Sequence, residues 1–229
     1  MKLAIMQPYF FPYIGYFQLI HAVDAFVVYD DVNFIKGGWI NRNFMLAQGE
    51  NQRFTLPLNN ASPNVLINQI KVGDDHGKIL KSVQHNYSKA PYYKDVFPII
   101  EQVMTHPDKN LAGYLGAGLK IVAGYLGLQM QWLLSSSLAK DNQLRSQGKV
   151  LAICRELTAH QYVNLPGGRL LYDTKTFEDT GIKLSFLQPG AVCYEQFRHD
   201  FVPNLSIIDV MMFNSRKECK KLLAEYTIV

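Results

Sequence analysis

Hydrophobic positions along the chain alternate between short apolar runs and stretches with helical spacing. Residues 3–6 and 24–29 are apolar runs, each of which predicts a buried strand. Between them, Phe17, Ile20 and Val23 recur at helical spacing, which predicts a helix. A strand, a helix and a second strand in this order form a βαβ unit, whose two strands lie parallel.

The same two patterns continue along the rest of the chain. Further strands are expected over residues 53–58, 66–72, 130–134, 161–165 and 182–187, of which the first two suit an antiparallel addition. Helices are expected over residues 77–87, 96–104, 111–126, 143–158, 175–179, 205–213 and 217–226. Alternating strands and helices predict an α/β fold, with a mostly parallel Rossmann-like sheet flanked by helices. Residues 1–229 contain no repeat or linker, so we expect a single domain with a helical elaboration over residues 75–127.

Composition narrows the class of protein without identifying it. Of the 229 residues, 48% are hydrophobic and 18% are charged, which excludes a disordered chain. The 23 Lys and Arg exceed the 19 Asp and Glu by only four, so we expect no nucleic-acid partner. Because no apolar run is long enough for a membrane span or a secretory signal, we expect a cytoplasmic protein without membrane insertion. The three cysteines match neither a disulfide framework nor a zinc pattern, and the sequence assigns no metal site and identifies no cofactor.

Three segments follow expected strands: residues 7–15, 30–43 and 165–172. In an open parallel sheet, ligands bind outside the carboxyl ends of the strands, so these segments are expected to meet around a site. The third contains Pro166, Gly167 and Gly168, a pattern that favours a plain turn over a phosphate-binding loop.

The segment after the first strand is rich in aromatic residues and contains two prolines. The prolines stiffen the backbone, and the aromatic rings offer flat faces to a base or a sugar ring. The helix that follows begins with free backbone N–H groups that suit a phosphate. A packed aromatic mini-core is the alternative interpretation. The candidate substrate-binding residues of this segment are Gln7, Tyr9, Tyr13 and Tyr16.

The segment after the second strand combines carboxylates, cations and amides. Asp30 and Asp31 end the strand, and Asp31 is a candidate catalytic base or, with Asp30, a ligand pair for a metal ion. Lys36 and Arg42 could hold a diphosphate. A solvated polar loop is the alternative for the whole segment. The candidate substrate-binding residues here are Lys36, Trp39, Asn41, Arg42 and Asn43.

Two further places in the chain carry candidate chemistry. His85 is a candidate catalytic acid or base, with Lys89 and Tyr92 as substrate-binding neighbours; its alternative role is to close a helix. Asp209 lies in an apolar run and needs a partner if it is buried. It is expected to be either a structural anchor or a substrate-binding residue.

Five ordered sequence blocks resemble the WbqC-like protein family. The blocks are residues 4–9 with 13–17, residues 30–34, residues 41–43, residue 85 with 87–92, and residues 205–209, so the resemblance covers essentially the whole chain. Members of this family tend to be encoded among genes for O-antigen and other surface polysaccharides. The resemblance implies an enzyme that transfers an acyl or aminoacyl group to the amine of a nucleotide-linked amino sugar. The implied partners are that sugar and an activated acyl donor, and an oligomer is possible.

A second likeness concerns only the layout of the first half of the chain. A strand, a proline-containing loop, a helix and a strand resemble the start of nucleotidylyltransferases and of pantoate–β-alanine ligase. Those enzymes carry histidines in the first loop, where this chain has Tyr13 and Tyr16. Two alternatives to the transferase therefore remain open: an ATP-dependent amide ligase that forms an acyl adenylate, and a non-catalytic nucleotide-sugar binding or scaffold subunit.

Overall fold

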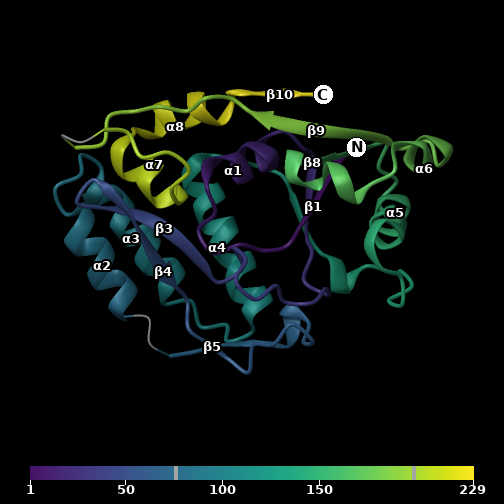
Figure 1. The fold of residues 1–229 in the computed structure, drawn as a ribbon, viewed down its shortest axis with the longest axis horizontal. Coiled ribbons are helices and arrows are strands. Elements are labelled where there is room, and N and C mark those ends of the chain that lie inside the picture. Colours follow the sequence, from purple (N-terminus) through teal and green to yellow (C-terminus); the bar gives the residue numbers. More distant parts are fainter. Residues whose placement is uncertain (75–76, 198–199) are drawn as a thin grey trace.

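The computed structural model describes residues 1–74, 77–197 and 200–229. Within them, six strands form a central sheet in the order β10-β9-β8-β1-β2-β7 (Figure 1). The neighbours from β9 to β7 pair in parallel, whereas β10 runs antiparallel to β9 at the edge. The predicted mostly parallel α/β sheet is confirmed. The strands are β1 (Lys2–Met6), β2 (Ala25–Val28), β7 (Gln131–Leu134), β8 (Gln161–Asn164), β9 (Lys183–Pro189) and β10 (Tyr226–Ile228).

The central strands are buried on both faces, as their continuous apolar runs predict. In β1, Leu3 and Ile5 enter one hydrophobic cluster and Ala4 enters the other; in β2, Val27 and Phe26 divide in the same way. The first cluster is completed by α5 (Ser146–Glu156) and α6 (Thr174–Asp179). The second is completed by α1 (Ile14–His21), α4 (Leu111–Leu126), α8 (Arg216–Leu223) and neighbouring elements.

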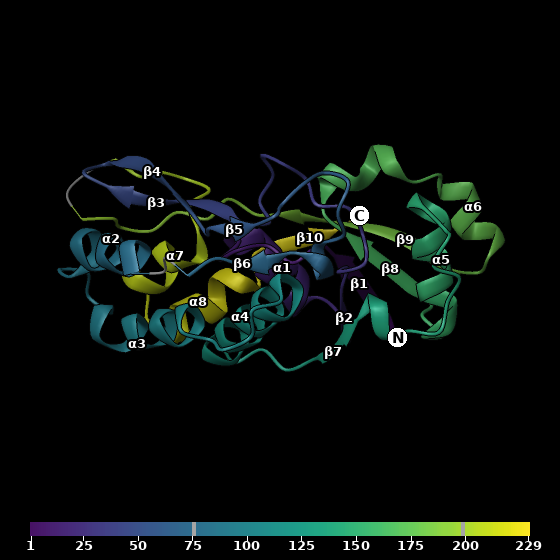
Figure 2. The same cartoon turned by 90° about the horizontal axis from the view of Figure 1, so that it is seen from below.

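The part of the molecule farthest from α5 and α6 is mostly helical (Figure 2). Three helices fall in the region where the helical elaboration is expected: α2 (Gly77–Tyr87), α3 (Tyr93–Met104) and α4. Residues 75 and 76 of that region lie outside the described residues. Next to these helices lie α7 (Ile207–Phe213), the antiparallel pair β3 (Arg42–Ala47) and β4 (Glu50–Thr55), and the short pair β5 (Leu58–Asn59) and β6 (Lys71–Val72).

Three of the expectations from the sequence are wrong and need correction. No strand is expected between residues 30 and 52, yet strand β3 lies there and turns into β4 through Gln48 and Gly49, both with positive φ (51° and 83°). Positive φ at both turn residues is typical of a two-residue β-hairpin. The polar residues on both sides of the turn hide this hairpin in the sequence. The expected strand over 66–72 is instead a 3-10 helix (Ile67–Gln69) followed by β6, and the expected last helix ends at Leu223, before β10.

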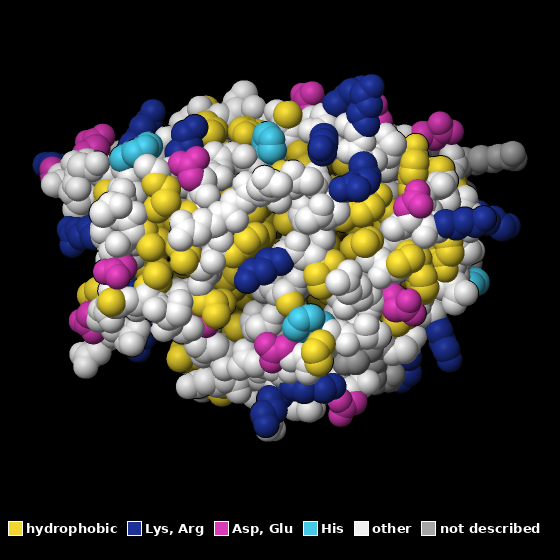
Figure 3. Space-filling model, turned by 180° about the vertical axis from the view of Figure 1, so that it is seen from behind, with side chains coloured by type: hydrophobic (Ala, Val, Ile, Leu, Met, Phe, Trp, Pro, Cys, Tyr) yellow, Lys and Arg dark blue, Asp and Glu magenta, His cyan; other side chains and the backbone are white. Residues whose placement is uncertain are grey.

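Two further short 3-10 helices follow strands at the carboxyl edge of the sheet. Ser135–Ser137 follows β7, and Pro166–Leu171 follows β8. On the face shown in Figure 3, basic and acidic side chains are interspersed around areas of hydrophobic side chains. Within the described part of the chain, no helix combines the length and apolarity that crossing a membrane requires.

Candidate functional site

Loops after β1 and before β3 enclose an open pocket of about 440 Å³, which we call the aromatic pocket. It is lined by Tyr9, Pro12, Tyr13, Trp39, Asn43 and Asn204. Four of these residues are substrate-binding candidates from the sequence, and they come from two separate segments. The structure therefore brings Tyr9, Tyr13, Trp39 and Asn43 together at one place.

Buried hydrogen bonds fix the wall of the aromatic pocket. The side-chain amide of Asn43 donates to the carbonyl oxygens of Phe10 (3.2 Å) and Phe11 (2.6 Å), and the hydroxyl of Ser206 also donates to Phe11 (2.8 Å). Phe11 has a positive φ of 43°, so its backbone conformation requires such support. Asn43 thus shapes the pocket through its amide hydrogens.

Gln7 and Tyr16, the two other candidates of the first segment, do not line the pocket. Tyr16 is fully buried, its hydroxyl donates to the carbonyl oxygen of Gln7 (2.8 Å), and its ring centroid lies 5.4 Å from that of Tyr9. Burial raises the pKa of the Tyr16 hydroxyl well above its usual value, with a further contribution from Tyr9. A Cβ at Gly15 would collide with the Tyr13 ring, so glycine is required for this ring position. Tyr16 and Gln7 support Tyr9.

The loop that carries Trp39 is held by Arg42. The Arg42 guanidinium donates through Nε to the carbonyl oxygen of Gly38 (3.1 Å) and through Nη2 to that of Gly37. This arrangement leaves Trp39 48% exposed beside the pocket. Asn41 donates to the carbonyl oxygen of Leu56 (3.0 Å), and the side chain of Lys36 is exposed.

A second pocket of about 670 Å³, the polar pocket, opens beyond the carboxyl ends of β2 and β7. Its lining is dominated by side-chain amides and charged groups: Asp31, Asn33, Asn64, Leu66, Asn68, Gln69, Ser136, Asn142, Arg145 and Lys149. Of the candidates from the sequence, Asp31 lines this pocket.

Asp31 lies between two buried lysines. Its Oδ2 is 2.9 Å from Nζ of Lys140 and 2.9 Å from Nζ of Lys149, and Lys149 also donates to its backbone carbonyl oxygen (2.7 Å). Burial opposes the charged carboxylate, but hydrogen bonds from Ser135, Lys149 and Lys140 outweigh burial and hold the pKa of Asp31 below its usual value. A carboxylate with a lowered pKa is a weak proton acceptor, and this argues against the role of catalytic base expected for Asp31.

Asp30 fixes the short helix after β7. Its carboxylate accepts hydrogen bonds from the backbone N–H (2.9 Å) and hydroxyl (2.5 Å) of Ser136 and from Asn68 (3.2 Å). Both carboxylates of the Asp30–Asp31 pair are therefore engaged by protein groups. Across the described ranges, no group of three or more His, Cys, Asp or Glu side chains is placed to hold a metal ion.

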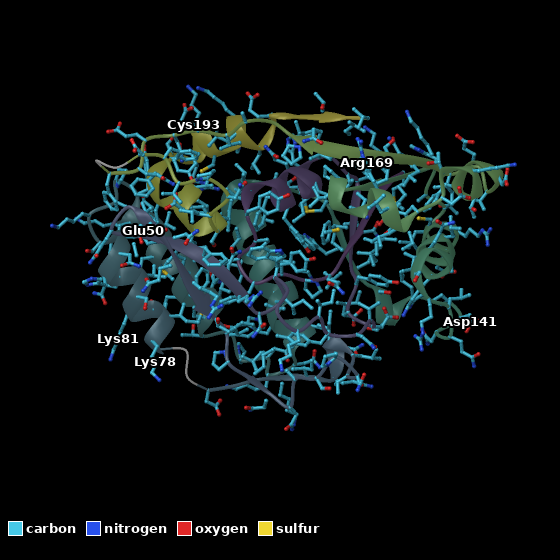
Figure 4. The ribbon with its side chains drawn as sticks, in the orientation of Figure 1. Glu50, Lys78, Lys81, Asp141, Arg169 and Cys193 are labelled. Atoms are coloured by element: carbon cyan, nitrogen blue, oxygen red, sulfur yellow. The ribbon has the colours of Figure 1, made fainter. Side chains whose placement is uncertain are left out.

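His85 and Lys89 are exposed, His85 in the last turn of α2 and Lys89 just beyond it. Tyr92 is half-buried, and its backbone N–H donates to Met212 (3.1 Å). The helix α2 and the helix α5, which carries the Lys149 partner of Asp31, lie on opposite sides of the molecule in Figures 1 and 2. Figure 4 shows the same separation for Lys78 and Lys81 on α2 and Asp141 near α5. His85 and Asp31 therefore cannot act on one reacting amine together.

Asp209 is completely buried among neutral donors. It accepts hydrogen bonds from the hydroxyls of Tyr87 (2.8 Å) and Tyr194 (2.8 Å) and from the amide of Gln196 (2.5 Å). Burial raises the pKa of Asp209, and these hydrogen bonds offset only part of that effect. The carboxylate joins α7 to α2 and to residues 194–196, which is the arrangement expected of a structural anchor.

Several residues at the two pockets were not anticipated from the sequence. Asn204, with a positive φ of 59°, reaches the aromatic pocket from the segment before α7. Lys140, Lys149 and Arg145 reach the polar pocket or its rim from the segment around the start of α5. A lysine in a predicted amphipathic helix is typical of a solvated face, so only the fold could reveal that Lys149 is buried.

Comparisons with known proteins agree with the resemblance found in the sequence. The model of the WbqC-like protein family matches residues 7–221. An uncharacterised protein of Mycobacterium tuberculosis, Rv1507c, is 27% identical over 227 residues, which is 97% of each chain. No solved structure matches significantly. Because the family model covers nearly the whole chain, this protein belongs to the WbqC-like protein family.

Proposed function

We propose that this protein is a transferase that acts on a nucleotide-linked amino sugar in the biosynthesis of a surface polysaccharide such as O-antigen. The proposed reaction is N-acylation or aminoacylation of the sugar amine. The observation that supports it most is the aromatic pocket, where Tyr9, Tyr13 and Trp39 from two loops line one opening. Family membership supports a biosynthetic enzyme and is consistent with this substrate class.

The aromatic pocket has the size and chemistry for such a substrate. Its volume of about 440 Å³ lies within the range of small-molecule sites, roughly 300–1,000 Å³. Aromatic faces pack against sugar rings and bases, and the side-chain amide of Asn204 supplies hydrogen-bonding atoms at the same opening.

The proposed chemistry is a direct acyl transfer. The neutral amine nitrogen attacks the carbonyl carbon of the activated donor, a C–N bond forms, and the leaving group departs with the electron pair of the broken bond. The amine loses its proton to the departing group of the donor or to water, because His85 and Asp31, the two acceptors expected from the sequence, do not line the aromatic pocket.

Mass spectrometry of the reaction mixture tests this proposal. The protein is incubated with a panel of nucleotide-linked amino sugars and either acyl-coenzyme A or an amino acid with ATP. The expected product is the nucleotide-linked sugar with one amine hydrogen replaced by the acyl group, formed without ATP when an acyl thioester is the donor. Product that forms only with ATP, together with AMP, would replace the proposal with the adenylating ligase. Binding of a nucleotide-linked sugar without product from any donor would favour the non-catalytic subunit.

The variant Trp39→Ala connects the assay to the aromatic pocket. We expect it to lower product formation at low substrate concentration, because an exposed ring beside the substrate is lost. Ile35→Ala is the matched control, since Ile35 is a similarly exposed apolar side chain (53%) of the same loop. Equal losses in both variants would contradict a role for the pocket.

A further inference from the structure

The polar pocket is bordered by an unusual concentration of buried charge. The side chains of Lys140 and Lys149 are 0% and 3% exposed, yet both ammonium groups approach the same carboxylate oxygen of Asp31. Burying a cation is costly unless an anion compensates it. One carboxylate oxygen shared between two ammonium groups provides only partial compensation.

The charges around the pocket do not balance. Of the charged residues that line the pocket, Arg145 and Lys149 are positive and Asp31 is negative, so the lining carries one surplus positive charge. The Asp30 carboxylate is also occupied by Ser136 and Asn68. The surplus positive charge predicts that an anion is favoured in the pocket.

Two cations are placed to reach such an anion. Lys149 lines the pocket, and its ammonium group has three N–H donors. One donates to the backbone carbonyl oxygen of Asp31 (2.7 Å), and Nζ also forms an ion pair with Oδ2 of Asp31 (2.9 Å). Arg145 is exposed at the rim, immediately before the first turn of α5. Its guanidinium can donate two parallel hydrogen bonds to a phosphate.

The remaining lining of the polar pocket defines the rest of the ligand. Neutral side-chain amides and a hydroxyl predominate: Asn33, Asn64, Asn68, Gln69, Asn142 and Ser136. Amides both donate and accept hydrogen bonds, so they suit the hydroxyl groups of a ribose or a hexose. A sugar phosphate ester combines an anion with neighbouring hydroxyl groups.

We propose that the polar pocket is a binding site for a sugar phosphate ester, in which Lys149 and Arg145 hold the phosphate and the amides hold the sugar hydroxyls. The site differs from the phosphate contacts expected from the sequence, which are Lys36, Arg42 and Lys89. It lies at the carboxyl edge of the parallel sheet, where ligands of such sheets bind. This inference does not depend on acyl transfer, because the site would bind a phosphate ester whatever reaction the protein performs.

Calorimetric titration with UDP and with glucose 1-phosphate tests the proposal, and glucose serves as the uncharged control. UDP binding would identify a nucleotide as the source of the phosphate, and glucose 1-phosphate binding would identify a sugar phosphate. We expect Arg145→Gln to weaken binding of the preferred ester by about 10-fold or more, because a charge-assisted hydrogen bond is lost. The matched control is Arg155→Gln, an exposed arginine in the last turn of the same helix.

Two results would overturn the proposal. One is the absence of binding by both esters, and the other is equal affinity of Arg145→Gln and wild type. Lys149→Gln is the second variant and should weaken the ester further if it folds, as thermal unfolding without ligand will show. If it does not fold, the comparison of Arg145→Gln with Arg155→Gln still decides, since both side chains are exposed.

Discussion

Two buried aspartates of this protein have opposite environments. Asp31 faces two lysines, which hold its pKa below the usual value, whereas Asp209 faces neutral donors and has a raised pKa because burial dominates. Asp31 is therefore stabilised as an anion between cations, and Asp209 links neighbouring elements through hydrogen bonds. In the sequence, Asp31 follows an apolar run and Asp209 lies within one, and neither position reveals which groups surround the carboxylate.

The charge of Asp31 makes the stability of the protein depend on pH. Because its folded-state pKa lies below the unfolded value of 3.8, its stabilising contribution is present above about pH 4 and is lost as the pH falls through the folded-state pKa. We expect Asp31→Asn to lower the free energy of unfolding at pH 7 by about 3 kcal/mol, since two lysines lose their partner. The deficit relative to wild type should shrink between pH 4 and pH 2.

Denaturant unfolding at several pH values measures this difference. Asp179→Asn, an exposed aspartate at the end of α6, is the control and should stay within about 0.5 kcal/mol of wild type at pH 7. A deficit of Asp31→Asn that is the same at pH 7 and pH 2 would show that the ionised carboxylate is not what stabilises this part of the fold.

Individual candidate residues could be found in the sequence, but their partners could not. Tyr9, Tyr13, Trp39 and Asn43 were identifiable because aromatic and amide residues are concentrated in loops after expected strands. The contact of Lys149 with Asp31 joins residues 118 positions apart, and no local pattern encodes it.

Among the helices and strands, a clear hydrophobic periodicity is sufficient to predict the bounds of an element, whereas a mixed periodicity is not. The helices α2 and α4 have the predicted bounds because their apolar positions follow a helical pattern without interruption. Strand β3 was missed because it buries the polar Asn43, whose amide is satisfied by the loop after β1. Strand β10 is three residues long and mostly exposed, so its apolar signal is weak.

The 3-10 helix after β8 depends on one of its two glycines. A Cβ at Gly168 would lie 2.6 Å from Nδ2 of Asn164, which donates to the hydroxyls of Tyr162 (3.1 Å) and Tyr172 (3.3 Å). We expect Gly168→Ala to lower the free energy of unfolding by about 1–3 kcal/mol, because this network must shift.

The neighbouring glycine provides the control for that variant. A Cβ at Gly167 would meet nothing within 4 Å, so Gly167→Ala should change the free energy of unfolding by no more than about 0.5–1 kcal/mol. Thermal unfolding of the two variants side by side makes the comparison. Equal stability of both would contradict the close packing of Gly168 on Asn164.

The whole molecule, rather than any one segment, creates the candidate site. The aromatic pocket combines the loop after β1, the loop before β3 and Asn204 from the far end of the chain, and the polar pocket combines residues from β2 to α5. The sequence predicts that loops at the carboxyl edge converge, because parallel strands share that edge. The sequence does not predict that the aromatic residues and the charged residues line two separate pockets.

Binding of a nucleotide-linked amino sugar in the aromatic pocket can be measured by tryptophan fluorescence. The chain has two tryptophans, so Trp132→Phe leaves Trp39 at the pocket as the only one. Titration of this variant with nucleotide-linked amino sugars should give a saturable change in emission. The reciprocal variant Trp39→Phe should give none. A ligand that binds by calorimetry but leaves the Trp39 emission unchanged, or changes only the Trp132 emission, would contradict binding in the aromatic pocket.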